Sequence, residues 1–427
     1  MRTRSRPLIA LVAAGLTAAG IIAATAPAAS AAPPPAADHV VFIALDGFDA
    51  RYLDDAPMPN LRHLVTRGSL TTSTGVMTSI TNPSWSSIAT GAWPETHLNT
   101  AYWFDAETGT ARSQQRDLAV PTIAEAIRDQ GGTVMSSQWF ILQNHGVVYG
   151  DPDALYTQPG GTCDRRADDA IAVLHGEPVD SGGSLTTANG IPDLIAVYCD
   201  TLDVLGHADG SAAAGMPAAL AEVDEQIGRI VQATKDAGIY GRTAFVITGD
   251  HGMSTFTQGM QAPLLAAIEA LGYDAEVLAA GRAPQPGTDV VIVIGGVGSL
   301  HLVGDAADDP TAAVRIEAAL AALPHVSAVY DEADQRAMHM SPKYGELVIE
   351  PEEGWSLGTT PADAAGVHGT SRNLEVPLVL SGAGVRPNGD PVNPRHIDVA
   401  PTIAALLGYD APAGADGRVL DEAVRAR

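Results

Sequence analysis

His39-Val-Val-Phe-Ile-Ala-Leu45 is a short stretch that is apolar throughout after its first residue and ends directly before Asp46. Residues 193–198 and 243–248 form runs of the same kind. Such runs lack the polar alternation of a half-exposed strand and are typical of parallel strands buried on both faces of a sheet. The three runs therefore predict an α/β fold with a mostly parallel sheet and helices on both of its faces.

Acidic residues follow each of these predicted strands, and histidines follow two of them. Asp46 follows the first, Asp203 and His207 follow the second, and Asp250 and His251 follow the third. In open α/β sheets, ligands bind outside the carboxyl ends of the strands. We therefore expect these side chains to converge at one edge of the sheet. Each pattern taken alone also occurs by chance, so the prediction depends on their combination.

Carboxylates and imidazoles in this arrangement are suited to bind two divalent cations. Two cations about 3.5–4 Å apart can neutralise a phosphate ester, activate a nucleophile and stabilise the leaving oxygen. Imidazole ligands favour zinc over magnesium. Asp203 and His207 are four residues apart and can chelate one ion. His368 would by itself be a loop histidine, but it adds a third imidazole to the set.

The nucleophile candidate lies in Thr81-Asn82-Pro83-Ser84-Trp85. Proline is common at the first position of a helix and asparagine at its N-cap, so we expect a helix to begin here, with Asn82 as cap and Pro83 first in the helix. Thr81 would then lie at the positive end of the helix, which favours phosphate. A metal bound to its hydroxyl would make it nucleophilic. The alternative is that Thr81 is an ordinary capping residue.

The segment 275–355 differs from the rest of the chain in its order of predicted strands and helices. Strands are expected at 289–294, 299–303 and 345–350 around one helix at 311–322, which indicates an α+β insertion or cap. A strand at 376–381 and a helix at 398–407 return to the main sheet. We predict one catalytic domain over 38–274 and 356–427, with 275–355 inserted into it.

The N-terminus has the pattern of a secretory signal peptide. Arginines at positions 2, 4 and 6 precede an apolar stretch from Leu8 to Ala24, and Ala29-Ser-Ala31 matches a cleavage site. We expect residues 1–31 to be removed, residues 32–37 to be a flexible spacer, and the protein to be secreted. A membrane anchor is the alternative, but the stretch is short for a span. No membrane span is expected elsewhere.

The net charge of the chain limits the class of molecule that it can bind, and its cysteine content limits the disulfides that it can form. The formal net charge of −26 argues against a nucleic-acid polymer, because phosphate backbones bind to lysine and arginine. Cys163 and Cys199 are the two cysteines. An oxidising compartment would permit a disulfide between them, and two free buried thiols are the alternative.

A set of motifs in this chain resembles the type I phosphodiesterase/nucleotide pyrophosphatase family of the alkaline phosphatase superfamily. The motifs are Leu45-Asp46-Gly47, Met58-Pro59-Asn60-Leu61, Thr81-x-Pro83, Ala89-Thr90-Gly91-x-x-Pro94-Glu95-x-His97, Asp203-x-x-Gly206-His207, Asp250-His251-Gly252-Met253 and Gly366-x-His368-Gly369. They fall within residues 38–104, 190–254 and 366–410. The resemblance implies an alkaline-phosphatase-like core and a small phosphate-ester or nucleotide-like substrate.

The resemblance also implies two zinc sites, with other divalent ions as alternatives. The site that activates the nucleophile would be formed by Asp46, Thr81, Asp250 and His251. The site that faces the leaving group would be formed by Asp203, His207 and His368. Thr81 would attack phosphorus and form a phosphothreonine, which water then hydrolyses with inversion at each step.

The chain departs from the family next to the nucleophile. Ser84 stands where the diesterases usually carry an asparagine that donates to a phosphate oxygen, and Trp85 stands where histidine is common. Ser84 can still donate one hydrogen bond. Trp85, Tyr102 and Trp103 could stack on a nucleobase or an alcohol leaving group, and ordinary packing is the alternative for each ring.

Four functions are compared. The leading one is a secreted zinc phosphodiesterase or nucleotide pyrophosphatase. A phosphomonoesterase usually has an extra cationic group that binds the doubly charged phosphate, and no residue of this sequence can be assigned to that role. A carbon–phosphorus hydrolase similar to phosphonoacetate hydrolase would need lysines to bind the substrate's carboxylate, and none lies between Met1 and Thr234. A catalytically silent metal-binding extracellular protein would have no need of the Thr81 hydroxyl.

Overall fold

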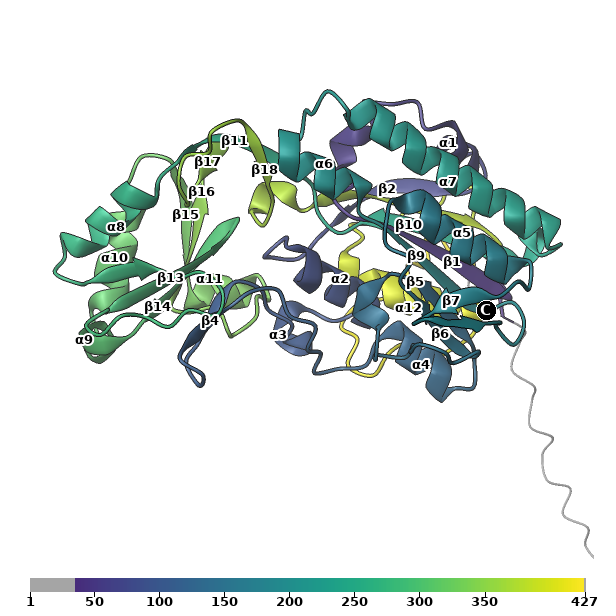
Figure 1. Cartoon of the computed structure of the whole chain (residues 1–427), viewed down its shortest axis with the longest axis horizontal. Helices are drawn as coiled ribbons and strands as arrows, with labels where there is room; N and C mark the ends of the chain where they lie inside the picture. The colour runs from purple at the N-terminus through teal and green to yellow at the C-terminus, as the bar shows by residue number, and fades with distance from the viewer. Residues whose placement is uncertain (1–34, 426–427) are drawn as a thin grey trace, which may run out of the picture. The chain divides into compact units, whose positions relative to one another are not determined.

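The central sheet of the computed structural model has seven strands (Figure 1). In spatial order they are β2 (Ser69–Thr74), β19 (Glu375–Gly382), β10 (Thr243–Gly249), β1 (His39–Leu45), β9 (Leu194–Cys199), β5 (Val134–Ser137) and β6 (Ala154–Thr157). The neighbours from β10 to β6 pair in parallel. In contrast, β19 is antiparallel to β10, and β2 is antiparallel to β19. The predicted α/β fold with a mostly parallel sheet is therefore confirmed.

Helices cover both faces of this sheet, as Figure 1 shows. Alternate side chains of β1 point to opposite faces, and both sets are buried. One face packs against α1 (Pro59–Val65), α5 (Cys163–Leu174) and α7 (Met216–Asp236). The other packs against α2 (Thr81–Thr90), α4 (Ile123–Asp129) and α12 (Val399–Leu407). Burial on two faces explains why the strands carry no polar alternation.

The structure describes residues 35–425. The expected signal peptide, residues 1–31, lies outside this range, as does the first half of the expected spacer. Ala37 is buried, and its N–H donates to the carbonyl oxygen of Leu406 at 3.0 Å. Packing therefore already includes the last residue of the stretch that was expected to be flexible. Within residues 35–425, no helix has both the length and the apolar character needed to cross a membrane.

A second sheet of five strands has its own hydrophobic core. Its order is β12 (Ala275–Val277), β13 (Val290–Gly295), β14 (Val297–Leu302), β16 (Leu347–Pro351) and β15 (Val326–Asp331). The packed helices include α8 (Gln261–Glu269) and α10 (Ala312–Ala321). The segment thus mixes strands and helices as the sequence indicates, and its predicted limits of 275 and 355 stay a prediction.

Local hydrogen bonds set the start of α4, which begins at Ile123. Thr122 and Glu125 form a capping box, in which the Thr122 hydroxyl accepts the Glu125 N–H at 3.2 Å and the Glu125 carboxylate accepts the Thr122 N–H at 2.7 Å. This exchange fixes the start of the helix.

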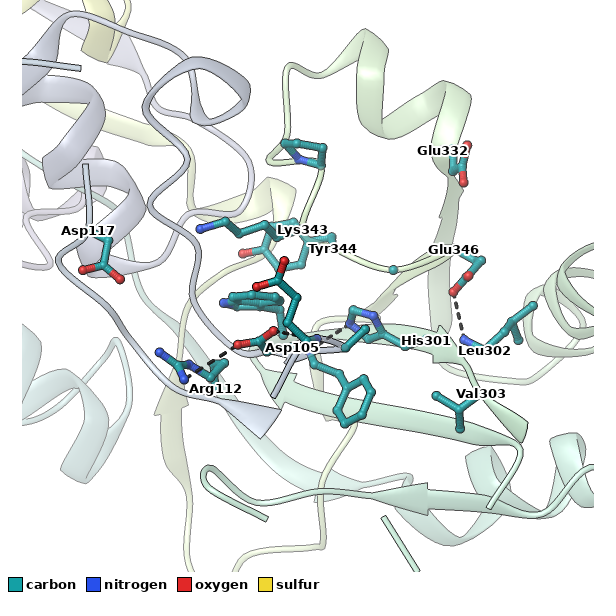
Figure 2. A pocket seen from close by; sticks show the side chains of 16 residues that line it. Asp105, Arg112, Asp117, His301, Leu302, Val303, Glu332, Lys343, Tyr344 and Glu346 are labelled. Carbon is teal, nitrogen blue, oxygen red and sulfur yellow. Dashed lines mark hydrogen bonds and ion pairs between the residues drawn. The ribbon is translucent and has the colours of Figure 1, made fainter. Parts of the chain in front are cut away.

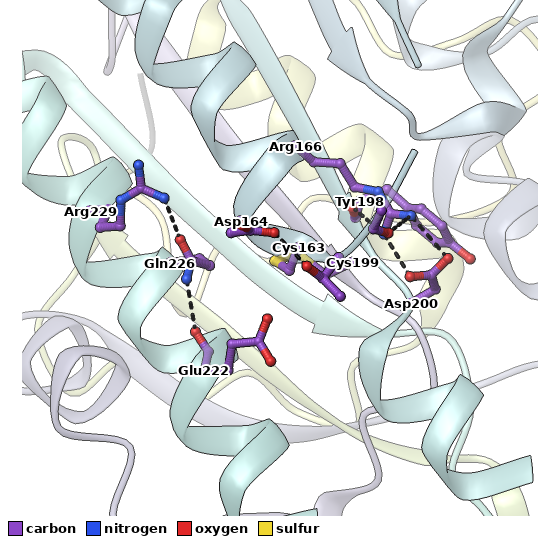
Figure 3. Close-up of a disulfide and its surroundings, with 11 residues drawn as sticks. Cys163, Asp164, Arg166, Tyr198, Cys199, Asp200, Glu222, Gln226 and Arg229 are labelled. Carbon is purple, nitrogen blue, oxygen red and sulfur yellow. Dashed lines mark hydrogen bonds and ion pairs between the residues drawn. A yellow bond between two sulfur atoms is a disulfide. The ribbon is translucent and has the colours of Figure 1, made fainter. Parts of the chain in front are cut away.

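A disulfide and an ion pair hold the chain where β9 ends (Figure 3). Cys163, at the start of α5, is bonded to Cys199, the last residue of β9, so the predicted bridge is confirmed. Buried Arg166 contacts both carboxylate oxygens of Asp200, at 2.7 and 3.1 Å. Bidentate pairs of this kind fix orientation. They anchor the segment that leads directly into α6 (Thr201–Asp209).

Candidate metal centre

The seven residues predicted from the sequence come from different elements and meet beyond the carboxyl ends of β1, β9 and β10. Asp46 follows β1, Asp250 and His251 follow β10, and Asp203 and His207 lie one turn apart on α6. Thr81 is the first residue of α2, and His368 directly follows β18 (Ala365–Val367). The side-chain distances below bring all seven into one cluster.

His251 is the centre of the first group of contacts. Its Nε2 atom lies 3.3 Å from Oδ1 of Asp46, 3.3 Å from Oδ2 of Asp250 and 3.3 Å from Oγ1 of Thr81. Asp46, Asp250 and His251 are fully buried or nearly so, and Thr81 is 8% exposed. This group contains the four residues expected to activate the nucleophile.

The second group is centred on Asp203. Its Oδ1 atom lies 3.4 Å from Nε2 of His207 and 3.7 Å from Nε2 of His368, and the two Nε2 atoms are 3.1 Å apart. The rings of His251 and His368 stack with centroids 3.5 Å apart. Nε2 of His251 is also 4.0 Å from Oδ1 of Asp203. The two groups are therefore adjacent, and His251 is within reach of both.

Backbone carbonyls fix the tautomer of all three histidines. Each Nδ1 atom contacts a carbonyl oxygen, which can only accept a hydrogen bond, so Nδ1 carries the hydrogen and Nε2 presents its lone pair. The pairs are His251 with Gly252 at 3.0 Å, His207 with Gly366 at 3.1 Å and His368 with Ser79 at 2.9 Å. This is the arrangement in which histidines bind a metal.

One oxygen of each carboxylate is left for a cation. Oδ1 of Asp46, Oδ1 of Asp203 and Oδ2 of Asp250 are buried, and none accepts a hydrogen bond from the described residues. The other oxygen of Asp250 accepts the N–H groups of Gly47 and His251, and that of Asp46 accepts the Tyr198 hydroxyl. Lone pairs of oxygen and Nε2 that face each other at 3.3 Å repel unless a cation lies between them, so the residues fit divalent metal ions.

The electrostatics of the cluster agree with this reading. Burial raises the pKa of Asp46 well above its usual value, and the neighbouring Asp203 carboxylate raises it further. Burial, followed by the charge of Asp46, also raises the pKa of Asp250. Burial lowers the pKa of His251 and His368. The imidazoles are therefore neutral, as metal binding requires, and the crowded carboxylates need a cation to stay ionised.

Helix α2 begins two residues earlier than the sequence indicated. Ile80 is the N-cap and Thr81 is the first helical residue, so Asn82 is not the cap and Pro83 is not first in the helix. Proline is tolerated throughout the first turn because N–H groups there have no partner within the helix. The correction leaves Thr81 at the positive end of the helix, as predicted.

Trp85, Tyr102 and Trp103 do not line one common substrate site. Trp85 is fully buried and packs edge-on against Phe42, Trp139 and Tyr198, so its expected contact with substrate is wrong. Residues close in sequence to Thr81 face the core because α2 is buried on all sides. Ser84 is also fully buried, and its hydroxyl has no partner among the described residues. Its contact with phosphate stays a prediction.

Tyr102 lines a small cavity beside the cluster. The cavity has a volume of about 180 Å³ and is bounded by Ile80, Tyr102, Gln114, His207, Ile294, Gly295, Gly296, Val367 and His368. The β13–β14 turn reaches this site only because it lacks side chains. A Cβ at Gly296, where φ is +90°, would lie 1.7 Å from the carbonyl oxygen of His368. The second sheet therefore contributes directly to the walls of the cavity.

Trp103 faces a different cavity. This larger space, of about 660 Å³, is bounded by Trp103, Arg112, His301, Lys343 and Glu346 among others (Figure 2). Lys343 lies over the Trp103 ring, 5.2 Å from its centroid. Trp103 is not among the residues that line the cavity beside His207 and His368. Its expected contact with a substrate at the metal centre therefore finds no support.

Two residues that sequence reasoning missed take part in the site. Tyr198 donates to Asp46 from the end of β9, and Gln114 reaches the start of α2 from a loop. Tyr198 could have been noticed as the one hydroxyl in an apolar strand. No local pattern in the polar segment 113–116 indicates what Gln114 contacts.

Comparison with known proteins agrees with the geometry. Residues 40–371 match the family model described as type I phosphodiesterase/nucleotide pyrophosphatase. The chain is similar to the bis(5'-adenosyl)-triphosphatase enpp4 of Xenopus laevis, with 27% identity over 50% of this chain and 47% of that protein. It is also similar to mouse enpp4, with 23% identity over 87% of this chain and 78% of that protein. The chain thus spans about half the length of the first relative.

Solved structures show the same fold. Murine ectonucleotide pyrophosphatase/phosphodiesterase 5 superimposes with a TM-score of 0.64 at 19% identity, over 87% of this chain and 96% of that one. An inactive threonine-to-alanine variant of the same murine protein, in complex with AMP, superimposes with a TM-score of 0.65 at 18% identity, over 88% and 96%. At this identity, the likeness concerns the fold.

Proposed function

Because the chain belongs to the type I phosphodiesterase/nucleotide pyrophosphatase family, a family of phosphoric ester hydrolases, we propose that it hydrolyses phosphate diesters at a two-zinc centre with Thr81 as nucleophile. The family predicted from the motifs is confirmed by the match to residues 40–371. The class of enzyme is confirmed with it. The zinc ions, the role of Thr81 and secretion belong to the proposal.

One observation supports the proposal above all others. Three imidazole Nε2 lone pairs and three unpaired carboxylate oxygens surround the space next to the Thr81 hydroxyl. A folded core would not favour so many acceptors around a single hydroxyl donor. A pair of divalent cations would satisfy them all, and the three imidazoles favour zinc.

The chain's own residues define the reaction. Asp46, Asp250 and His251 would hold the ion beside Thr81, and Asp203, His207 and His368 the other; when bound, these ions supply Lewis acidity that lowers the pKa of the Thr81 hydroxyl and neutralises the leaving oxygen. Oγ1 of Thr81 gives its proton to solvent and bonds to phosphorus. The bond from phosphorus to the leaving oxygen breaks, and that oxygen takes the electron pair. Water then cleaves the phosphothreonine and restores the hydroxyl.

Substrate and location are inferred from the relatives and from the chain itself. The relatives named above act on, or are described with, adenine nucleotides, which supports a nucleotide-like diester or pyrophosphate here. The expected signal peptide and the Cys163–Cys199 disulfide support secretion, because disulfides persist in oxidising compartments.

The proposal is tested by parallel assays of the zinc-loaded protein. The substrates are bis-p-nitrophenyl phosphate, p-nitrophenyl phosphate, a nucleotide p-nitrophenyl ester and phosphonoacetate. We expect the two diesters to have the highest kcat/KM. Faster hydrolysis of p-nitrophenyl phosphate would indicate a monoesterase, and cleavage of phosphonoacetate a carbon–phosphorus hydrolase. Inactivity towards all four would favour the catalytically silent metal-binding protein.

A further inference from the structure

The start of α2 has two backbone N–H groups that the helix itself does not use, those of Thr81 and Asn82. Ser84 N–H donates to the carbonyl oxygen of Ile80 at 3.0 Å, and Pro83 has no N–H. Asn82 N–H, next to the nucleophile, donates to Oε1 of Gln114 at 2.9 Å. A side chain from a distant loop therefore occupies the donor adjacent to Thr81.

This hydrogen bond fixes which way the Gln114 carboxamide faces. A backbone N–H can only donate, so the oxygen of Gln114 must point to Asn82 and its NH₂ group must point away. No residue among those described accepts a hydrogen bond from that NH₂ group. The loop is itself held in place, because Asn82 Nδ2 donates to the backbone carbonyl oxygen of Gln115.

Gln114 lines the same cavity as two of the metal-binding histidines. That cavity, of about 180 Å³, is lined by His207, His368, Gln114 and Tyr102 among others. No lysine or arginine lines it. The anchored carboxamide is thus a neutral donor in a space that adjoins the Thr81 end of the helix. A neutral donor suits the single charge of a phosphate diester better than the double charge of a monoester.

We infer that Gln114 binds the phosphoryl group of the substrate, with Oε1 held by Asn82 N–H and Nε2 donating to a non-bridging phosphate oxygen. This inference rests on the proposed function and deepens it, because it names the group that selects a monoanionic diester. Gln114 would then be a catalytic residue that carries the positive end of the helix dipole to the substrate. It supplies the donor that Ser84, closed off in the core, was expected to provide.

Two substitutions separate this role from simple helix capping. Gln114→Glu keeps an oxygen on Asn82 N–H, and so keeps the cap, but it replaces the NH₂ donor by a negative charge. Gln114→Ala removes both the cap and the donor without adding charge. Capping alone predicts that the glutamate variant resembles wild type, whereas phosphate binding predicts that it is the most impaired variant.

The matched control is Gln115→Glu. It adds the same charge one residue away, on a side chain that contacts Arg112, Ser113 and the Gln114 carbonyl and does not line the cavity. All variants are prepared zinc-loaded. The readouts are kcat/KM for bis-p-nitrophenyl phosphate, the melting temperature, and the dissociation constant of inorganic phosphate by titration calorimetry.

We expect Gln114→Ala to lower kcat/KM by about 10- to 100-fold, the usual effect of one donor to a charged group, and to weaken phosphate binding in parallel. Gln114→Glu should lower both further without lowering the melting temperature, and Gln115→Glu should resemble wild type. A glutamate variant as good as wild type, or an alanine variant faster than wild type, would overturn the inference. If wild type hydrolyses no ester, the proposed function fails, but the phosphate affinities still test Gln114.

Discussion

Tyr198 donates its hydroxyl hydrogen to Oδ2 of Asp46, so a residue at the end of β9 fixes a carboxylate at the end of the adjacent strand β1. The bond occupies one oxygen of Asp46 and leaves the other, Oδ1, without a partner among the described residues and 3.3 Å from His251. Asp46 is thereby held with its free oxygen towards the metal centre. Partners of metal ligands generally contribute to metal affinity in this way.

Removing this hydroxyl should weaken metal binding. We expect Tyr198→Phe to raise the dissociation constant for zinc by about 10- to 100-fold, because Asp46 loses the bond that orients it. The measurement is a competition titration with a chromogenic chelator. Tyr156→Phe is the control, since Tyr156 is also buried and its hydroxyl has no partner among the described residues. Equal zinc affinities in the two variants would exclude an orienting role for Tyr198.

Thr81→Ala should abolish turnover and spare the fold. Its hydroxyl is the nucleophile of the proposed mechanism, so we expect kcat to fall by on the order of 10³-fold or more, whereas Thr81→Ser should retain part of the activity. Circular dichroism and zinc content should match wild type for both variants. Turnover of the alanine variant at a rate comparable to wild type would remove Thr81 from the mechanism.

Metal removal should make stability depend on pH in a particular direction. Elemental analysis should find about two zinc ions per chain, because imidazoles supply three of the ligands. In chelated protein, the pKa values of Asp46 and Asp250 are higher in the folded than in the unfolded state. The folded state then holds more protons, so unfolding free energy should fall as pH rises above about 4.

The free energy of unfolding of chelated protein is measured by urea unfolding at several pH values above about 4, with zinc-loaded protein as control. Zinc should remove the contribution of these two carboxylates, since the cation takes the place of the protons. The assignment would be contradicted if the free energy of unfolding of the chelated form rose with pH above about 4. It would also be contradicted if elemental analysis found only calcium or magnesium.

His396 should make the protein sensitive to acid. It is fully buried, both ring nitrogens lack partners among the described residues, and burial lowers its pKa to about 3. Its folded pKa is below the unfolded value of about 6.5, so stability is lost as pH falls through this interval, by about 1.4 kcal/mol per pH unit. His396→Gln should flatten the profile. The free energy of unfolding of chelated wild type and chelated His396→Gln is measured at pH 7, 6 and 5. Equal slopes against pH for the two proteins would show that His396 has no part in the acid sensitivity.

The sequence predicted the candidate metal-binding cluster mainly because Asp46, Asp203 and Asp250 follow strands that are recognisable from their composition. The runs before Asp46 and Asp250 lack the alternation of polar and apolar residues, since both faces of the sheet are covered, and parallel strands bring their carboxyl ends together. The same logic could not place Trp85. Neighbourhood in sequence to Thr81 does not say which side of α2 faces the core, and α2 is buried on every side.

Gln114 lay beyond sequence reasoning for a different reason. Its partner Asn82 is 32 residues away, and the loop that carries it has no periodicity that fixes its position. The approach of Gly296 to His368 also depends on how two sheets pack. Contacts of this kind depend on the tertiary structure, so the local sequence pattern does not predict them.

The stereochemical course of hydrolysis tests the central claim most directly. A chiral phosphorothioate diester is hydrolysed by zinc-loaded protein in isotopically labelled water, and the configuration at phosphorus in the product is determined. Attack by Thr81 and then by water inverts phosphorus twice, so the account predicts net retention. Net inversion would mean that water attacks the diester directly and that no phosphothreonine forms.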